Sequence, residues 1–241
     1  MKRAVRKSKT EYRIRRTILY YSRMSSVTRG YGLLEGWLSR LRSAMAERLI
    51  PATLRGGRLL DIGCGQTPMF LLQTIFGERI GIDQHVSAEA RELAARRGIT
   101  LIEQDMEVQR RLPFNDASVD VVTMLAVFEH VKPDDLTLLI REIHRILKPG
   151  GTYIVTTPAR WTDPILAVMS FLRLVSADEI DEHEEMHTRA SLKETIAKGG
   201  FRPGDIETGT FECGMNLWAR ATKLILRGVD PEPSRRAQDD N

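Results

Sequence analysis

The stretch Leu59-Leu60-Asp61-Ile62-Gly63-Cys64-Gly65 decides the fold of this chain. A short apolar run ends in an acid and two glycines, which predicts a buried strand followed by a tight loop. Neither glycine carries a Cβ and both tolerate positive φ, so the backbone of this loop can approach a ligand closely. The helix expected to open at Gln66-Thr67-Pro68 presents unpaired amide groups to the same place. The stretch therefore predicts a cofactor-binding loop.

Two further acids indicate which cofactor the loop holds. A dinucleotide fingerprint requires a third glycine three residues after the second, and Pro68 occupies that position. Arg79-Ile80-Gly81-Ile82-Asp83 predicts a second strand ending in an acid 20 residues after Gly63, the spacing of a carboxylate that binds ribose hydroxyls. Ile99–Glu103 predicts a third strand, and in the following Gln104-Asp105-Met106 the acid can accept a hydrogen bond from an adenine amino group while the methionine packs on the ring. These patterns favour an adenosine with free ribose hydroxyls and no pyrophosphate.

The order of these motifs resembles the class I S-adenosylmethionine-dependent methyltransferases of the small-molecule type. The resemblance continues through a predicted fourth strand at Val119–Met124 and the segment Leu125-Ala126-Val127-Phe128-Glu129-His130-Val131. It then passes through Glu142–Gly151, a helix and a tight turn, to a predicted fifth strand at Thr152–Thr157. Each motif alone is weak, but five motifs in the right order and at the right spacing make the resemblance specific.

The resemblance implies an α/β fold: a Rossmann-like three-layer αβα sandwich with a mostly parallel seven-stranded sheet and an antiparallel edge strand. It covers residues 57–160 closely and 187–222 more loosely. Strands that alternate with helices independently predict parallel pairing with right-handed crossovers. The remaining helices and a final pair of edge strands are expected at Phe70–Phe76, Ala88–Arg97, Asp134–Leu147, Thr188–Gly200, Asp205–Thr210 and Leu217–Thr222.

The same resemblance implies that S-adenosylmethionine binds beyond the carboxyl ends of the strands. Asp61 and the glycine loop would hold its methionine end, Asp83 its ribose, Asp105 and Met106 its adenine, and Leu125 would line the sulfonium side. The residues expected to bind the cofactor are Asp61, Gly63, Cys64, Gly65, Asp83, Gln84, Asp105, Met106 and Leu125. No metal site is expected.

His130 is the candidate catalytic residue. Methyl transfer from a sulfonium is an in-line displacement, so an enzyme mainly supplies position and desolvation. A general base is needed only where the acceptor must lose a proton, as an alcohol or a phenol does. Imidazole titrates in the useful range, so His130 can take that proton; the alternative is a histidine that makes structural hydrogen bonds at the start of a helix. Glu129 is expected to orient groups rather than to catalyse.

Composition indicates a globular cytoplasmic enzyme with a basic N-terminal arm. Of the 241 residues, 42% are hydrophobic and 28% charged, as in ordinary globular domains. The two cysteines, Cys64 and Cys213, form neither a disulfide framework nor a zinc-ligand pattern. No apolar stretch is long enough to span a bilayer, and the N-terminus lacks the apolar core of a signal peptide. The net charge of +4 arises within residues 1–30, where ten Lys or Arg residues stand against one acid, Glu11.

We expect three parts in the chain. Residues 1–30 form a basic, partly disordered arm, residues 31–227 a single methyltransferase domain, and residues 228–241 a disordered tail. The domain begins with an amphipathic helix at Leu33–Ile50 and contains an insertion at 158–186 that closes the substrate side of the pocket; ordinary core packing is the alternative for both. Because both elements are apolar, we expect a small-molecule or a lipid- or glycan-linked acceptor. The basic arm offers peripheral membrane contact, with a solvated tail as the alternative. The sequence leaves the oligomeric state open.

Two other functions stay open. Tyrosines interleave with the basic residues of the arm and could stack on RNA bases, but an RNA methyltransferase is less favoured because no RNA-binding module is recognisable. A non-catalytic S-adenosylmethionine-binding protein is the second, since the acids indicate binding rather than turnover. The segment His183-Glu184-Glu185-Met186-His187 spells a metalloprotease pattern. Its charged surroundings and the lack of a third ligand speak against a metal, and Thr188 is better suited to begin the next helix.

Overall fold

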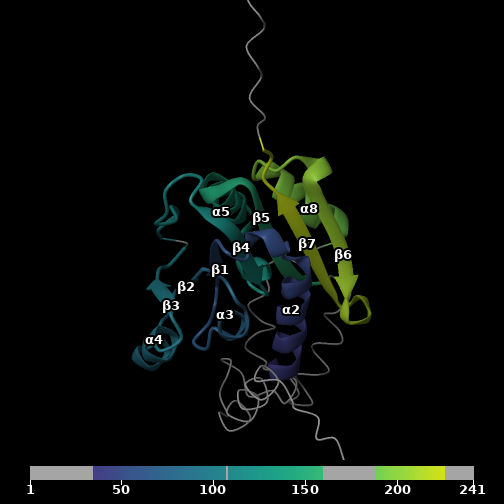
Figure 1. The fold of residues 1–241 in the computed structure, drawn as a ribbon. Helices are drawn as coiled ribbons and strands as arrows, with labels where there is room; N and C mark the ends of the chain where they lie inside the picture. Colours follow the sequence, from purple (N-terminus) through teal and green to yellow (C-terminus); the bar gives the residue numbers. More distant parts are fainter. Residues whose placement is uncertain (1–34, 107, 160–187, 226–241) are drawn as a thin grey trace, which may run out of the picture.

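The computed structural model describes residues 35–106, 108–159 and 188–225 (Figure 1). Four expectations therefore concern residues outside the described ranges. These are the arm at 1–30, nearly all of the insertion at 158–186, the segment His183–His187 and the tail at 228–241.

A seven-stranded sheet in the order β3-β2-β1-β4-β5-β7-β6 organises the fold. Its strands are β1 Arg58–Ile62, β2 Glu78–Asp83, β3 Ile99–Glu103, β4 Val119–Leu125, β5 Leu147–Pro158, β6 Ile206–Phe211 and β7 Asn216–Thr222. Strands β1 to β5 pair in parallel, whereas β7 runs antiparallel to both β5 and β6. The predicted α/β fold with a mostly parallel seven-stranded sheet is confirmed. The antiparallel strand β7 lies one place inside the sheet, and β6 forms the edge.

Helices cover both faces of the sheet and make the three layers. They are α2 Glu35–Leu49, α3 Met69–Gln73, α4 Ala88–Ala95, α5 Pro133–Ile146 and α8 Arg189–Lys198. Leu59 of β1 shares a core with α2, α3 and α4, whereas the next residue, Leu60, shares a core with α5 and α8. Successive strand residues point to opposite faces, so Asp61 belongs to the face that α2, α3 and α4 cover.

The sequence of helix α5 determines where the helix begins and which of its residues are buried. Pro133 stands in its first turn, where a missing amide proton costs nothing, and Asp134 lies near the positive end of the helix dipole. The buried apolar residues recur at helical spacing: Leu136, Leu139, Ile140, Ile143 and Ile146. Lys223 follows β7 and closes the other end, because its Nζ donates to the carbonyl oxygens of His144 and Leu147, each at 2.7 Å. Lys223 thereby fixes the C-terminal end of α5 to the sheet.

Helix α2 packs mainly through its second half. Trp37, an apolar residue near its start, is 53% exposed. The buried residues of α2 are Ser43, Ala46 and Leu49. Arg55 fixes the end of the helix, since its guanidinium pairs with Glu47 at 2.7 Å and donates to Thr74 at 3.2 Å. The end of α2 nearest the sheet is thus tied to the segment that follows α3.

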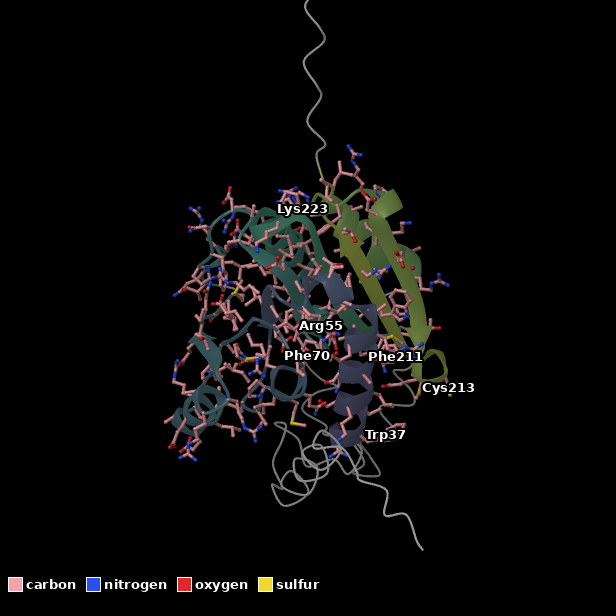
Figure 2. All side chains as sticks on the ribbon, in the orientation of Figure 1. Trp37, Arg55, Phe70, Phe211, Cys213 and Lys223 are labelled. Atoms are coloured by element: carbon pink, nitrogen blue, oxygen red, sulfur yellow. The ribbon has the colours of Figure 1, made fainter. Side chains whose placement is uncertain are left out.

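The strand order reverses between β1 and β4, and such a reversal leaves a crevice beyond the carboxyl ends of the strands. The turn between β6 and β7 reaches the same edge, because β6 runs parallel to β5. Figure 2 shows Trp37 and Cys213 toward one end of the molecule and Lys223 toward the opposite end. The carboxyl ends of the parallel strands lie on the side of Trp37 and Cys213, since Lys223 binds where β5 begins.

Candidate functional site

The loop after β1 has a backbone geometry that glycine adopts freely. Gly63 and Gly65 have φ angles of 71° and 70°. A Cβ on Gly63 would lie 2.2 Å from Cγ2 of Val127, whereas a Cβ on Gly65 would meet nothing within 4 Å. The amides of Gly63 and Cys64 donate to the carbonyl of Ile82 at 2.8 and 3.2 Å, which holds the loop against the end of β2. Gly63 is therefore enclosed by protein, and Gly65 stands at the open side where a ligand can approach the backbone.

Asp83, the last residue of β2, accepts hydrogen bonds from two loops. Its Oδ2 accepts from the amide of Gly65 at 2.8 Å and its Oδ1 from the amide of His85 at 3.2 Å. The residue is half-buried, and each carboxylate oxygen keeps a second lone pair, so it can still accept from a ligand hydroxyl. This is the arrangement expected of a ribose-binding acid.

Gln66 joins the same two loops, a role that the motif spacing did not reveal. Its Nε2 donates to the carbonyl oxygen of His85 at 2.7 Å, and its Oε1 accepts from the amide of Ser87 at 3.1 Å. Ser87 is also the N-cap of α4. The side-chain amide thus ties the glycine loop to the start of the helix after β2.

Asp61 is a buried carboxyl at the end of β1. It is 4% exposed, and its Oδ1 accepts a hydrogen bond of 2.6 Å from the hydroxyl of Thr123, its partner across β4. Burial raises the pKa of Asp61 to about 7; the Thr123 hydrogen bond lowers it and the charge of Asp83 raises it. A carboxyl held near neutrality in this way is suited to a cationic partner. Sequence reasoning found Asp61 and missed Thr123.

Cys64 contributes its backbone to the loop and its side chain to the core. The residue is 8% exposed, and a Cβ on Gly81 would lie 2.6 Å from its sulfur, so the thiol packs against β2. Burial, with the charges of Asp61 and Asp83, raises the pKa of the thiol. Any contact of Cys64 with a cofactor is therefore expected through the backbone.

The loop after β3 is closed by Gln104, which sequence reasoning did not single out. Its amide donates to the carbonyl of Asp83 at 2.9 Å. Its buried side chain donates to the carbonyl oxygens of Gln109 and Arg111, both at 3.0 Å. These bonds draw the loop back toward the end of β2 and hold Asp105 and Met106 at that edge.

The predicted adenine-side residues differ in exposure. Asp105 is exposed, and its Oδ1 accepts from the amide of Val108 at 3.3 Å. Met106 is half-buried and packs against the core. Gln84, next to Asp83, is exposed. Asp105 and Met106 thus lie at the carboxyl end of β3, on the same edge of the sheet as the glycine loop.

Strand β4 ends in a strained turn. Leu125 is half-buried in register with Thr156 of β5. The next residue, Ala126, has a φ of 56°, which is uncommon for a residue with a Cβ, and its amide donates to the carbonyl of Thr156 at 3.0 Å. Such strain is often stored at functional sites, and it directs Val127 against Gly63.

A single 3₁₀ turn, η2 (Phe128–His130), follows β4 and contains a buried acid. Glu129 is 3% exposed, and its Oε2 is buried with no hydrogen-bond partner among the residues that the structure describes. An unpaired buried carboxylate oxygen is costly and calls for an explanation such as a ligand. His130 is half-buried, and its amide donates to the carbonyl of Val127 at 3.0 Å.

The polar groups at this edge are carboxylates, amides and hydroxyls. In the described ranges, no group of three or more His, Cys, Asp or Glu residues could hold a metal ion. No helix in that part of the chain is long and apolar enough to cross a bilayer. Hydrogen bonds join Asp61 to β4 and the glycine loop to Asp83, while His130 follows on the β4 side. The glycine cradle and the buried acid fit a nucleoside with a cationic amino-acid end.

Comparisons of the sequence with known proteins identify a methyltransferase domain. Residues 60–155 match the family model described as a methyltransferase domain. The chain is 30% identical to the ubiquinone/menaquinone biosynthesis C-methyltransferase of Rubrivivax gelatinosus, over 67% of this chain and 63% of that protein. It is 30% identical to the ubiquinone biosynthesis O-methyltransferase of Nitrosococcus oceani, over 62% of this chain and 65% of that protein. The chain thus spans slightly less than two thirds of the length of each relative.

The likeness to solved structures concerns the fold. An S-adenosylmethionine-dependent methyltransferase from Thermotoga maritima aligns with a TM-score of 0.59 at 22% identity. The alignment covers 88% of this chain and 98% of that one. The described residues in Figure 1 therefore share their fold with a methyltransferase of known structure.

Proposed function

We propose that this chain, which belongs to the class I S-adenosylmethionine-dependent methyltransferase family, transfers a methyl group from S-adenosylmethionine to a small-molecule acceptor. The observation that carries the proposal is the pairing of two acids around one glycine loop. Asp83 holds the amide of Gly65 at 2.8 Å, and Asp61 lies buried at the end of the neighbouring strand. Two relatives named as quinone-biosynthesis methyltransferases support a small organic acceptor.

The binding roles follow from what each group can accept. Asp83 accepts hydrogen bonds from the ribose hydroxyls, for which its free lone pairs remain available. Gly65 lets the backbone approach the cofactor, and Asp61 pairs with the ammonium group of the methionine end. Asp105 and Met106 bind the adenine, and Leu125 lines the sulfonium side. When bound, S-adenosylmethionine supplies a methyl group on a positively charged sulfur, which an acceptor atom displaces in line.

The acceptor side is formed by the turn after β4. The buried Oε2 of Glu129 accepts a hydrogen bond from the acceptor and orients it. His130 takes the proton that an alcohol or a phenol must lose on methylation. A lipid- or glycan-linked acceptor, membrane contact through the arm and a cytoplasmic location stay predictions, since no observation on the described residues tests them.

Calorimetry on the full chain tests the cofactor assignment. We expect S-adenosylhomocysteine to bind and NAD to show no heat of binding, because the loop lacks the third glycine of a dinucleotide site. Binding of NAD instead would overturn the proposal.

Transfer of a labelled methyl group tests the reaction. The chain is incubated with methyl-labelled S-adenosylmethionine and a cell extract, which is then separated into small-molecule, lipid, RNA and protein pools. Label in the small-molecule pool supports the proposal. Label in RNA would favour the arm-dependent RNA methyltransferase, and binding without any transfer would favour a non-catalytic protein.

A further inference from the structure

Thr123 and Asp61 form a buried polar pair between neighbouring parallel strands. They are direct partners in the register of β1 and β4, and Thr123 is fully buried. The Thr123 hydroxyl lies 2.6 Å from Oδ1 of Asp61 and 3.5 Å from the carbonyl oxygen of Leu60. A hydroxyl has one proton to donate, and the shorter contact takes it. The single hydrogen bond of Thr123 is therefore committed to the carboxyl of Asp61.

The other groups around Asp61 supply no positive charge. Asp83, from the end of β2, acts on Asp61 with a like charge, and the thiol of Cys64 is itself held in its neutral form. Helix α3, with the sequence MFLLQ, has no ionisable side chain, and the buried residues of α2 are uncharged. No lysine or arginine of the described ranges is among the groups that shift the titration of Asp61. Among the described residues, the hydroxyl of Thr123 is thus the group that favours the ionised carboxylate.

We infer that Thr123 is a positioning residue, which orients the carboxyl of Asp61 toward the ammonium group of the cofactor and links cofactor binding to the release of a proton. The inference rests on the proposed function, because it assigns that ammonium group to the methionine end of S-adenosylmethionine. Thr123 thus acts on cofactor binding through Asp61, without itself touching the cofactor.

The proton linkage follows from the burial of Asp61. With a pKa of about 7, this carboxyl is partly protonated at neutral pH in the cofactor-free protein. A cation placed beside it favours the charged form and lowers the pKa, so the proton leaves as the cofactor binds. Affinity then rises with pH until Asp61 is ionised in the free protein, and levels off above that point.

Two probes separate the methionine end from the nucleoside. S-adenosylhomocysteine carries the ammonium group, whereas 5′-methylthioadenosine keeps adenine, ribose and sulfur but lacks the amino-acid end. Calorimetry at pH 7 compares the full-length wild type with Thr123→Val and with Thr123→Ser. We expect Thr123→Val to lower the affinity for S-adenosylhomocysteine by roughly ten-fold or more, the scale of a lost hydrogen bond to a charged group. The affinity for methylthioadenosine should stay unchanged. Thr123→Ser, which keeps the hydroxyl, should restore the affinity.

The pH profile supplies a second readout that a merely structural role would not move. In wild type the affinity for S-adenosylhomocysteine should rise from pH 5.5 to pH 7.5, and in Thr123→Val the rise should move to higher pH. Calorimetry in buffers of different ionisation enthalpy should detect a proton released by wild type at pH 7, and none by Asp61→Asn.

The outcomes are separable. If Thr123→Val lowers the affinity for both probes equally, the role of Thr123 is overturned while the proposed function stays intact. The same holds if the affinity for S-adenosylhomocysteine and its pH profile are unchanged. Should Thr123→Val fail to fold, the wild-type measurement decides, because binding without proton release at pH 7 would also overturn the inference. If wild type binds neither probe, the proposed function itself fails.

Discussion

The carboxylate of Asp83 accepts a hydrogen bond of 2.8 Å from the amide of Gly65, so the acid that ends β2 also fixes the loop that follows β1. Two motifs that lie 18 residues apart in the chain are joined at one point. The proposed cofactor site is consequently a single unit, in which a change at Asp83 also affects the glycine loop.

Replacing Asp83 tests this unit. Asp83→Ala removes the acceptor of both amides and of the ribose hydroxyls, so we expect S-adenosylhomocysteine to bind about 1.5–3 kcal/mol more weakly, the scale of a lost charged hydrogen bond. Glu78→Ala, at the other end of the same strand, is the matched control and should leave the affinity unchanged. Equal affinities for wild type and Asp83→Ala in calorimetry would remove the ribose assignment.

The two glycines of the loop should respond differently to a Cβ. Gly65→Ala adds only the left-handed backbone penalty, about 1–2 kcal/mol, because its Cβ enters open space. Gly63→Ala adds a collision with Val127 to the same penalty, so its free energy of unfolding should fall further. Urea denaturation of both variants measures the difference, and a larger loss for Gly65→Ala would contradict the loop geometry.

Asp61 should make the cofactor-free protein less stable as pH rises. Its pKa is raised from 3.8 to about 7 on folding, so between these values the folded state holds a proton that the unfolded state has released. The stability that this group contributes is present at low pH and is lost as pH rises toward 7. A rise in pKa from 3.8 to about 7 corresponds to on the order of 4 kcal/mol. Urea denaturation should show that the free energy of unfolding declines less between pH 5 and pH 8 in Asp61→Asn than in wild type. An identical decline in both proteins would contradict the assignment.

Gln66 should affect binding more than stability. The Gln66→Ala variant loses both hydrogen bonds to the loop after β2. At about 0.5–1.5 kcal/mol per bond, the affinity for S-adenosylhomocysteine should fall by a few-fold to ten-fold or more. The side chain is exposed, so the melting temperature should change little. Gln73→Ala, at an exposed position in α3, is the control. Loss of stability without loss of affinity would argue against a role at the site.

Glu129 should separate binding from transfer. Glu129→Gln replaces a carboxyl at a position that is only 3% exposed with a neutral amide, so the free energy of unfolding should stay equal or rise. The affinity for S-adenosylhomocysteine should be unchanged, while methyl transfer to the small-molecule pool falls. A variant that transfers methyl groups at the wild-type rate would remove Glu129 from the acceptor side.

Local patterns predicted most of the elements. The expected helix at Ala88–Arg97 is observed at Ala88–Ala95, and the expected strand at Ile99–Glu103 has those bounds. Both segments are short, periodic and bounded by clear signals, including Ser87 as an N-cap. Strand β5 is longer than predicted because it begins at Leu147, directly after α5, with a register shift opposite β4 and with Gly150 at a φ of 81°.

The parts of the site that the sequence did not predict depend on pairings between distant segments. Thr123 acts on Asp61 because the two strands align in one register, and Gln66 acts on His85 because two loops meet. Neither partner carries a sequence motif, so the spacing along the chain contains no signal for them. The places of Asp61, Asp83 and the two glycines at the ends of β1 and β2 were predictable because their spacing along the chain is local.

The turn between β6 and β7 places the exposed Cys213 at the edge of the sheet where the glycine loop also lies, while Cys64 is buried and its thiol stays protonated. A maleimide dye at neutral pH should consequently attach at a single place among the described residues, without any engineering of the chain. Its emission then offers an optical reporter of events at that edge in solution.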